Sequence, residues 1–286
     1  MACQGLPSNS FVAGMIDYVD CQAQTIGASG YQALSAPGSS LSLLLAGLLT
    51  LFVAFFGYRM LFGESLTVRD GVLAMIKIGI VLALATGWPA YRTLIYDVAL
   101  RGPAELAGEI GAPAALPGTT GGMVARLDYA DRALLAFAIQ GTGEASAAAV
   151  TPEQQAQSVL QPGQRMPLLS FNELMLGGAR VLFLASAIGA LAVVRLVAGL
   201  LLALGPFFIA FLLFDGTRGL FEGWLRVLGG AALGALGTAI VLGVELALLE
   251  PWLANLLAYR YAGYQTPGAA MEVFAVTLIF AVTLAA

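Results

Sequence analysis

The chain has 286 residues, of which 59% are hydrophobic and only 10% are charged, and its formal net charge is −4. Soluble domains carry about 25% charged residues, so this composition and a mean hydropathy of +0.86 exclude an ordinary soluble protein and predict a polytopic membrane protein. Neither half of the chain is strongly basic, which argues against tight binding of duplex DNA, because such binding needs several neutralised phosphates.

The sequence lacks the residues on which several kinds of chemistry usually depend. The sequence has no His, only two Cys, and no GxxxxGK[ST] nucleotide loop. Imidazoles and thiolates are the usual metal ligands, and the nucleotide loop is the mark of an ATP-driven motor. A pair of proteolytic carboxylates in facing spans is also missing, since Glu245 is the sole candidate inside a span. We therefore expect no catalytic residue, no cofactor and no metal, and the protein is not expected to be an enzyme.

Residues 1–40 contain acidic but no basic side chains, and the positive-inside bias therefore places them in the periplasm. Apolar residues recur there at helical spacing and predict a short amphipathic helix lying on the outer face of the membrane. The stripe consists of Phe11, Met15, Tyr18 and Val19, beside Gln22, with Ser8 or Asn9 as the expected cap. A flexible tail is the alternative.

Cys3 and Cys21 both fall in this periplasmic segment, where an oxidising environment allows a disulfide. A continuous helix between them would separate their Cα atoms by roughly 27 Å at ~1.5 Å per residue, which is far beyond bonding distance. The bond therefore requires the first residues to fold back along the helix. The sequence leaves the bonded and the free forms equally open.

Two apolar runs, at about 41–61 and 71–88, form the first transmembrane hairpin within residues 41–91. The turn between them holds Arg59 and Arg69, which place it in the cytoplasm. Lys77 lies one to two turns inside the second run. We expect its long stem to extend to the lipid headgroups, in preference to a buried functional lysine. Trp88 and Pro89 mark the outer boundary.

Residues 92–172 are the only long polar region and are expected to form a partly helical periplasmic central loop. A second amphipathic helix is predicted from Met123 to Gln140. Val124, Leu127, Leu134 and Ala138 line one of its faces, and Asp128 can pair with Arg132 at i, i+4 on another. Residues 141–163, rich in Ala, Gln, Ser and Gly, form the least ordered part. The helical pieces predict an interaction surface, with a passive connector as the alternative.

Residues 173–286 form the C-terminal transmembrane bundle. Residues 174–214 are apolar apart from Arg180 and Arg195, and they permit a hairpin near Val194-Arg195 or one long kinked helix. We expect the hairpin, because a helix of forty residues would be about 60 Å long, twice the ~30 Å hydrocarbon core. Gly205-Pro206 predicts a kink in the apolar run 196–214.

Polarity changes abruptly after Phe214. Asp215, Arg218, Glu222 and Arg226 follow within twelve residues, with Trp224 among them. This pattern predicts a membrane exit with an aromatic anchor.

The next span, about 227–249, carries small residues at every fourth position, a spacing that lets another helix come close. The packing ridge consists of Gly230, Ala231, Gly234, Ala235, Ala239, Gly243 and Ala247. Glu245 on the same helix is expected to face protein or water, because a carboxylate in hydrocarbon is costly; an interfacial position is equally open. A tyrosine-rich boundary, 251–267, precedes a last apolar run, 273–286. In total we expect an all-α membrane protein with about five to six transmembrane helices.

The segment LLLALGPFFIAFLLFDGTRGLFEGWLR resembles the signature region of the TrbL-like polytopic inner-membrane subunit of bacterial type IV secretion systems. The FGYRMLFGES turn, followed by RDGVLAMIKIGIVLALATGWPAYRTLIYDV, resembles the first hairpin of that family. Together these segments cover about a quarter of the chain. Gly205-Pro206, the TRGLF containing Arg218, and Trp224 carry most of the resemblance.

The resemblance implies a multimeric channel or assembly platform of the bacterial inner membrane that supports conjugation, substrate translocation and pilus biogenesis. It implies as partners further copies of the chain, the major and minor pilus subunits, the inner-membrane scaffold, the secretion ATPases and, transiently, the translocated DNA or protein. A purely structural platform without a pore is a further option. The alternative from another class is a small-solute secondary transporter, which would need internal repeats or broken helices that meet charged residues at the midplane.

Overall fold

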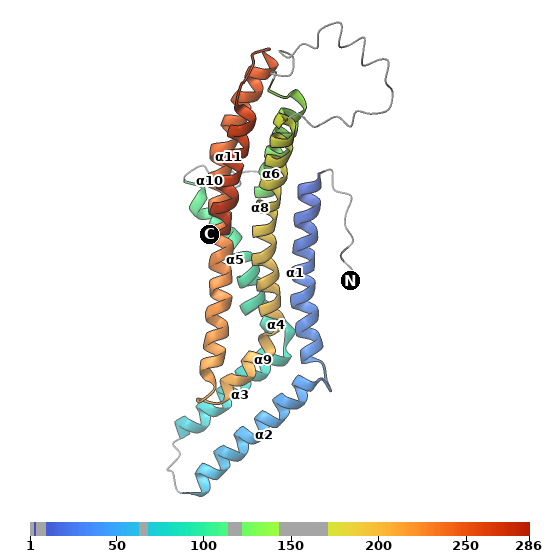
Figure 1. Cartoon of the computed structure of the whole chain (residues 1–286). Helices are drawn as coiled ribbons and strands as arrows, with labels where there is room; N and C mark the ends of the chain where they lie inside the picture. Colours follow the sequence, from blue (N-terminus) through green and yellow to red (C-terminus); the bar gives the residue numbers. More distant parts are fainter. Residues whose placement is uncertain (1–2, 4–9, 63–67, 114–121, 143–170) are drawn as a thin grey trace. The chain divides into compact units, whose positions relative to one another are not determined.

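A computed structural model of the chain describes residues 3, 10–62, 68–113, 122–142 and 171–286 (Figure 1). All regular secondary structure in these ranges is helical, which confirms the all-α class. The elements are α1 (Phe11–Ser35), α2 (Ser40–Leu61), α3 (Val68–Thr86), α4 (Trp88–Tyr91), the π-helix η1 (Arg92–Tyr96), α5 (Asp97–Gly111), α6 (Met123–Gln140), α8 (Phe171–Ala203), α9 (Gly205–Ala210), the 3₁₀-helix η3 (Phe211–Leu213), α10 (Arg218–Tyr261) and α11 (Ala269–Ala285).

The chain divides into two compact units. Unit 1 comprises Met1–Leu6, Asp17–Ala107 and Ala192–Gly237, and unit 2 comprises Pro7–Ile16, Gly108–Leu191 and Thr238–Ala286. The core of unit 1 joins buried side chains of α1, α2, α3, α4, η1, α8, α9, η3 and α10. The core of unit 2 joins α6 to parts of α8, α10 and α11. Each unit therefore has its own packed interior.

Three helices in the described part of the chain are long and apolar enough to cross a membrane: α2, α8 and α10. A fourth span results if α3 and the helices from Trp88 to Gly111, which meet at an angle of 90°, count as one broken span. α11 is apolar but has only 17 residues. Five to six spans were expected, and most of the difference comes from α8, which is one helix where the sequence predicted two.

The predicted hairpin near Val194-Arg195 is wrong. α8 continues without interruption for 33 residues, from Phe171 to Ala203, and is therefore about 50 Å long. Neither Val nor Arg breaks a helix, and the charge of Arg195 is matched by Asp20, so Arg195 does not need an aqueous turn. The helix ends instead at Gly205-Pro206, the predicted kink, because Pro206 lacks an N–H.

α10 also runs past a predicted boundary. It has 44 residues and continues through Pro251 to Tyr261, so the first part of the tyrosine-rich boundary segment predicted at 251–267 is helical. Proline is tolerated inside membrane helices when neighbouring groups satisfy the freed backbone. At ~1.5 Å per residue, α10 is about 66 Å long and exceeds the ~30 Å hydrocarbon core, so part of it lies outside that core or it is steeply tilted.

Both predicted amphipathic helices exist in the described chain. α6 spans Met123–Gln140, as predicted, and its expected inner residues Leu127 and Leu134 are buried. α1 begins at Phe11, where the Ser10 side chain accepts a hydrogen bond from the Ala13 backbone N–H at 3.2 Å. The cap expected at Ser8 or Asn9 and the segment 143–163 lie outside the described residues.

In unit 1, α1 and α8 are packed closely through small residues. A Cβ at Gly199 would lie 2.6 Å from the Ala23 carbonyl oxygen, and one at Gly30 would lie 2.5 Å from the Ala203 Cβ. Because Ala23 meets Gly199 and Gly30 meets Ala203, the two helices run in the same direction. α1 therefore lies alongside α8 in this region, and its expected place on the outer face of the membrane stays a prediction.

We expect Gly199→Ala to lower the thermal stability of the purified protein. Alanine favours a helix over glycine by about 1 kcal/mol, but here the added methyl group meets the backbone of α1, and overpacking costs about 1–3 kcal/mol. Gly189→Ala is the matched control on the same helix, because its Cβ meets no described atom within 4 Å. Melting curves in one detergent compare the two variants. A Gly199→Ala protein as stable as Gly189→Ala would contradict the close contact.

Candidate functional site

The predicted kink at Gly205-Pro206 is a complete helix break. α8 ends at Ala203, and the short α9 begins at Gly205. Because Pro206 has no N–H, the carbonyl of Leu202, four residues earlier, loses its helical donor. An unsatisfied carbonyl costs several kcal/mol in hydrocarbon. The break can therefore persist only if other groups supply hydrogen-bond donors.

Two aromatic side chains of unit 1 supply those donors. The Tyr91 hydroxyl donates to the Leu202 carbonyl at 2.6 Å, and the Trp224 indole N–H donates to the Leu201 carbonyl at 2.9 Å. Both side chains are buried. The prediction that Trp224 anchors a membrane exit is therefore wrong: its indole faces the protein interior and satisfies the end of α8.

Glycine is required at this break because the tyrosine comes so close. A Cβ at Gly205 would lie 2.1 Å from the Tyr91 hydroxyl oxygen. A second break, between α3 and α4, also combines a glycine, a proline and a tyrosine that donates to a backbone carbonyl. There a Cβ at Gly87 would lie 2.4 Å from the Ala83 carbonyl oxygen, Pro89 follows, and the Tyr31 hydroxyl donates to the Leu84 carbonyl at 2.9 Å.

Two of the donors, Tyr31 and Tyr91, belong to one aromatic cluster, which also contains Trp88 and Tyr96; the third donor, Trp224, stacks on Phe208 instead. The rings of Tyr31 and Tyr91 are stacked with centroids 4.5 Å apart, and Trp88 lies 5.1 Å from Tyr31 and 5.5 Å from Tyr96. The Tyr96 hydroxyl donates to the Gln24 carbonyl of α1 at 3.1 Å. The cluster thus joins α1 to both helix breaks.

Two cationic sites predicted in unit 1 are paired. Lys77 Nζ lies 2.7 Å from Asp215 Oδ1, and the Lys77 side chain is 37% exposed. The lysine that was expected to reach the headgroups is therefore paired with a carboxylate. The hydrogen bond from Lys77 holds the pKa of Asp215 below its ordinary value. Arg218 Nε lies 2.7 Å from Glu222 Oε1.

Arg195 of α8 pairs with Asp20 of α1. This pair lies about one helical turn from Gly199 and Ala23, where the two helices are in close contact. Cys21 follows Asp20 and forms a disulfide with Cys3, with Cα atoms 5.9 Å apart. The short Cα distance means that Cys3 is folded back onto α1, which is the geometry that the bonded form requires.

Charged residues of unit 2 hold α6 against α8 and α10. Arg180 forms a bidentate pair with Asp131, with Nε–Oδ1 and Nη2–Oδ2 distances of 2.6 and 3.0 Å. Arg126 Nη1 lies 3.1 Å from Glu250 Oε2, and Arg260 Nε donates to the Gly141 carbonyl at 2.8 Å. The predicted pair between Asp128 and Arg132 is present. α6 is therefore an integral part of a helical bundle.

Glu245 lies inside unit 2 and is only 4% exposed, which matches the expectation that it faces protein. The Thr283 hydroxyl of α11 donates to Glu245 Oε1 at 2.6 Å. Its other oxygen, Oε2, is buried without a hydrogen-bond partner among the described residues.

The predicted packing ridge on α10 is unevenly covered. Gly230 and Gly234 are exposed, the four alanines are half-buried and Gly243 is buried. A Cβ at Gly230 would meet no described atom within 4 Å. Space for a neighbouring helix therefore remains at the N-terminal part of the ridge.

The sequence analysis did not predict the small-residue contact between α1 and α8, although Ala23-xxx-Gly27 and Gly199-xxx-Ala203 show the same spacing as the ridge.

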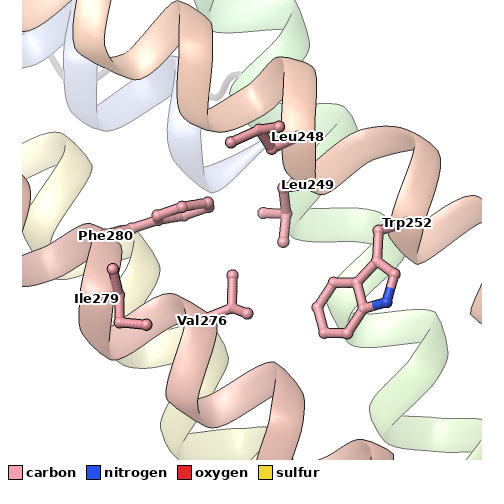
Figure 2. Close-up of a pocket in the computed structure, with 6 residues that line it drawn as sticks. All are labelled: Leu248, Leu249, Trp252, Val276, Ile279 and Phe280. Carbon is pink, nitrogen blue, oxygen red and sulfur yellow. The ribbon is translucent and has the colours of Figure 1, made fainter.

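An apolar pocket of about 230 Å³ lies between α10 and α11 in unit 2 (Figure 2). It is lined by Leu248, Leu249 and Trp252 of α10 and by Val276, Ile279 and Phe280 of α11. None of these side chains can act as an acid, a base or a nucleophile. Across the described residues, no group of three or more His, Cys, Asp or Glu could hold a metal ion. The hydrogen bonds and ion pairs described above hold helices against one another.

We expect Tyr91→Phe and Trp224→Phe each to destabilise the protein by about 1–3 kcal/mol, because each leaves a buried carbonyl without its donor. Tyr58→Phe is the control, since Tyr58 is an exposed tyrosine of the same unit. Thermal or denaturant unfolding in detergent gives the comparison. Equal stability of Tyr91→Phe and Tyr58→Phe would show that the break does not need the hydroxyl.

We also expect Asp131→Asn to loosen α6, because it leaves the Arg180 charge partly buried and unpaired. Arg132→Gln is the control, since the Arg132 side chain is 72% exposed and such ion pairs contribute little. Limited proteolysis within 122–142 reports the docking. Cleavage at the wild-type rate in Asp131→Asn would argue against the bidentate pair as the main attachment of α6.

One family of proteins matches most of this chain. The family model described as TrbL/VirB6 plasmid conjugal transfer protein matches residues 49–286, which include both helix breaks, α6 and the packing ridge. No curated protein matches the sequence. The chain thus belongs to the TrbL/VirB6 family of plasmid conjugal transfer proteins, as the resemblance indicated, and is a multi-pass membrane component of a conjugal transfer and type IV secretion machine.

Proposed function

We propose that the protein is a multimeric subunit of the inner-membrane channel and assembly platform of a type IV secretion machine, where it supports substrate translocation and pilus biogenesis. The family match over residues 49–286 carries this proposal. The proposed partners are other copies of the chain, the major and minor pilus subunits, the inner-membrane scaffold and the secretion ATPases. The sequence contains no nucleotide loop, so the energy for transport comes from the ATPases.

The proposed orientation has the N-terminus in the periplasm. Residues 1–40 contain no Lys or Arg, and the turn after α2 contains Arg59 and Arg69, which the positive-inside bias assigns to the cytoplasm. The disulfide between Cys3 and Cys21 supports the same orientation, because such bonds form in the oxidising periplasm.

The proposed contact surface for substrate or pilus subunits is α6, which belongs to the central region 92–172. Its inner face is fixed by Asp131 and Arg126, while Tyr129 and Ile139 are exposed at 50% and 74%. A helix that is held rigidly on one side and exposes large apolar residues on the other is suited to docking. Any contact with DNA is transient, since the chain has a net charge of −4.

The alternative of a small-solute transporter gains no specific support. The chain has broken helices, which that class uses to hold ions with freed carbonyls. The carbonyls of Leu201 and Leu202, however, already accept hydrogen bonds from Trp224 and Tyr91. The breaks therefore serve the packing of the chain.

Oligomer formation through the packing ridge predicts that Gly230→Leu lowers the mass of the assembly. The added side chain fits the single chain, because a Cβ there meets no described atom within 4 Å, but it would block a neighbouring helix. Gly47→Leu on α2, where a Cβ is equally unobstructed, is the control. Native mass spectrometry gives the readout, and an unchanged oligomer in Gly230→Leu would remove the ridge from the interface.

The translocation role predicts that deleting the gene abolishes plasmid transfer and that the wild-type gene restores it. A photo-crosslinking amino acid at Ile139 should then capture DNA or secreted protein during transfer, whereas one at Val53, a residue of α2 exposed at 58%, should capture none. Crosslinks to pilus subunits alone would restrict the role to assembly. Normal transfer by the deletion strain would contradict the proposal.

A further inference from the structure

One carboxyl group of unit 2 lies in an apolar interior without a matching charge. Glu245 of α10 is only 4% exposed, and none of the ion pairs between described residues includes it. Its Oε2 atom is buried without a hydrogen-bond partner among the same residues. An isolated buried carboxylate costs so much free energy that such a group usually takes up a proton instead.

The cations of the surrounding helices are engaged at other sites. In the described part of unit 2 the pairings are Arg126 with Glu250, Arg132 with Asp128, Arg180 with Asp131, and Arg260 with the Gln140, Gly141 and Tyr264 carbonyls. The one ionisable side chain of α11 is Glu272, in its first turn, about 16 Å along the helix from Thr283. Residues 10–16, the described N-terminal part of unit 2, carry no charge. Each described cation of unit 2 therefore has a partner other than Glu245.

The contacts of Thr283 also favour a protonated Glu245. The Thr283 hydroxyl oxygen lies 2.6 Å from Glu245 Oε1 and 2.9 Å from the Phe280 carbonyl oxygen. A hydroxyl group has one hydrogen to donate, so it cannot donate fully to an ionised Glu245 and to the carbonyl at once. If Glu245 is protonated on Oε1, its O–H donates to Thr283, and Thr283 donates to Phe280. Protonation therefore satisfies both short contacts.

The apolar pocket between α10 and α11 leads toward this acid. On α10, the lining residue Leu249 lies four residues after Glu245. On α11, the lining residue Phe280 lies three residues before Thr283, and Figure 2 shows Leu249 and Phe280 facing the same space. Residues at these spacings share one helix face, so the acid lies about one turn beyond the lining residues. The pocket volume of about 230 Å³ exceeds that of a cavity of ~150 Å³ that takes up benzene.

We infer that Glu245 is a proton-binding site that keeps its proton at neutral pH and is open to small apolar reagents through the pocket between α10 and α11. The matching chemical class is a neutral, apolar reagent that reacts with protonated carboxyl groups, such as dicyclohexylcarbodiimide. Loss of the proton would place an unpaired charge between the two helices. The docking of α11 therefore depends on the protonation of Glu245.

The reaction with the carbodiimide is an addition. The carboxyl O–H adds across one C=N bond, so that the carboxyl oxygen bonds to the central carbon and the proton moves to a nitrogen. The acyl carbon then leaves that oxygen for the second nitrogen, and the central carbon becomes a urea carbonyl. No atom leaves, so the product carries the mass of the whole reagent. An ionised carboxylate lacks the proton that the first step requires.

The test incubates the purified full-length protein with dicyclohexylcarbodiimide in detergent at neutral pH and locates adducts by peptide mass spectrometry. Glu245 should gain the mass of one reagent molecule, and Glu245→Gln should lose this adduct. Glu272, which is exposed on α11, is the internal control, because an ionised carboxylate should remain unmodified. Absence of the Glu245 adduct, or equal modification of Glu272, would overturn the inference.

Two variants of α11 test the route to the acid. Val276→Phe fills the pocket that Val276 lines and should slow the modification of Glu245. Leu278→Phe changes an exposed residue that does not line the pocket and should leave the rate unchanged. Equal rates in the two variants would contradict entry through the pocket.

The bound proton gives a second readout that needs no reagent. A group that holds a proton in the folded protein but releases it in the unfolded chain makes folding less favourable as the pH rises. The melting temperature of the wild type should therefore fall relative to that of Glu245→Gln between about pH 5 and about pH 8, since glutamine stays neutral. A constant difference would overturn the inference. Neither measurement uses a secretion assay, so the outcome is separate from that of the proposed function.

Discussion

The structure of unit 1 depends on a backbone carbonyl that would otherwise have no donor. Pro206 removes the N–H that the carbonyl of Leu202 would use, in a run of nineteen residues without a charged or hydrogen-bonding side chain. Water cannot replace that donor in hydrocarbon. The Tyr91 hydroxyl does so from α4, and the Trp224 indole serves the neighbouring carbonyl of Leu201 from α10. One helix break therefore fixes the positions of two other helices.

Charged residues within the candidate spans also have a polar partner on another helix. Arg195 is matched by Asp20, Arg180 by Asp131, and Glu245 by the Thr283 hydroxyl. Each partner comes from a helix distant in sequence, so each polar contact selects one neighbour and one register. Small residues then set how closely the helices approach, as between Gly199 and Ala23. In a machine built from several membrane proteins, such contacts give the subunit a defined surface to present.

The sequence alone was informative where a signal is local. The bounds of α6 follow from its apolar period, and the end of α8 follows from Gly205-Pro206. The partners of the polar residues could not be found in this way, because pairing Asp131 with Arg180 or Tyr91 with Leu202 depends on how distant helices pack. Trp224 shows the limit well. A tryptophan beside charged residues is typical of a membrane interface, yet here its N–H is needed inside the protein. The hairpin prediction failed because it assumed that a helix cannot much exceed the ~30 Å hydrocarbon core, whereas α8 runs on for 33 residues.

The central claim is that α8 is one continuous helix that crosses the membrane and ends at the Gly205-Pro206 break. Single cysteines at Glu173, in the first turn of α8, and at Gly216, after the break, are both exposed and test it most directly in a chain with Cys3 and Cys21 replaced by serine. A membrane-impermeant maleimide should label residue 173 in intact cells and residue 216 only after the inner membrane is permeabilised. Labelling of both positions from the same side would contradict the single crossing.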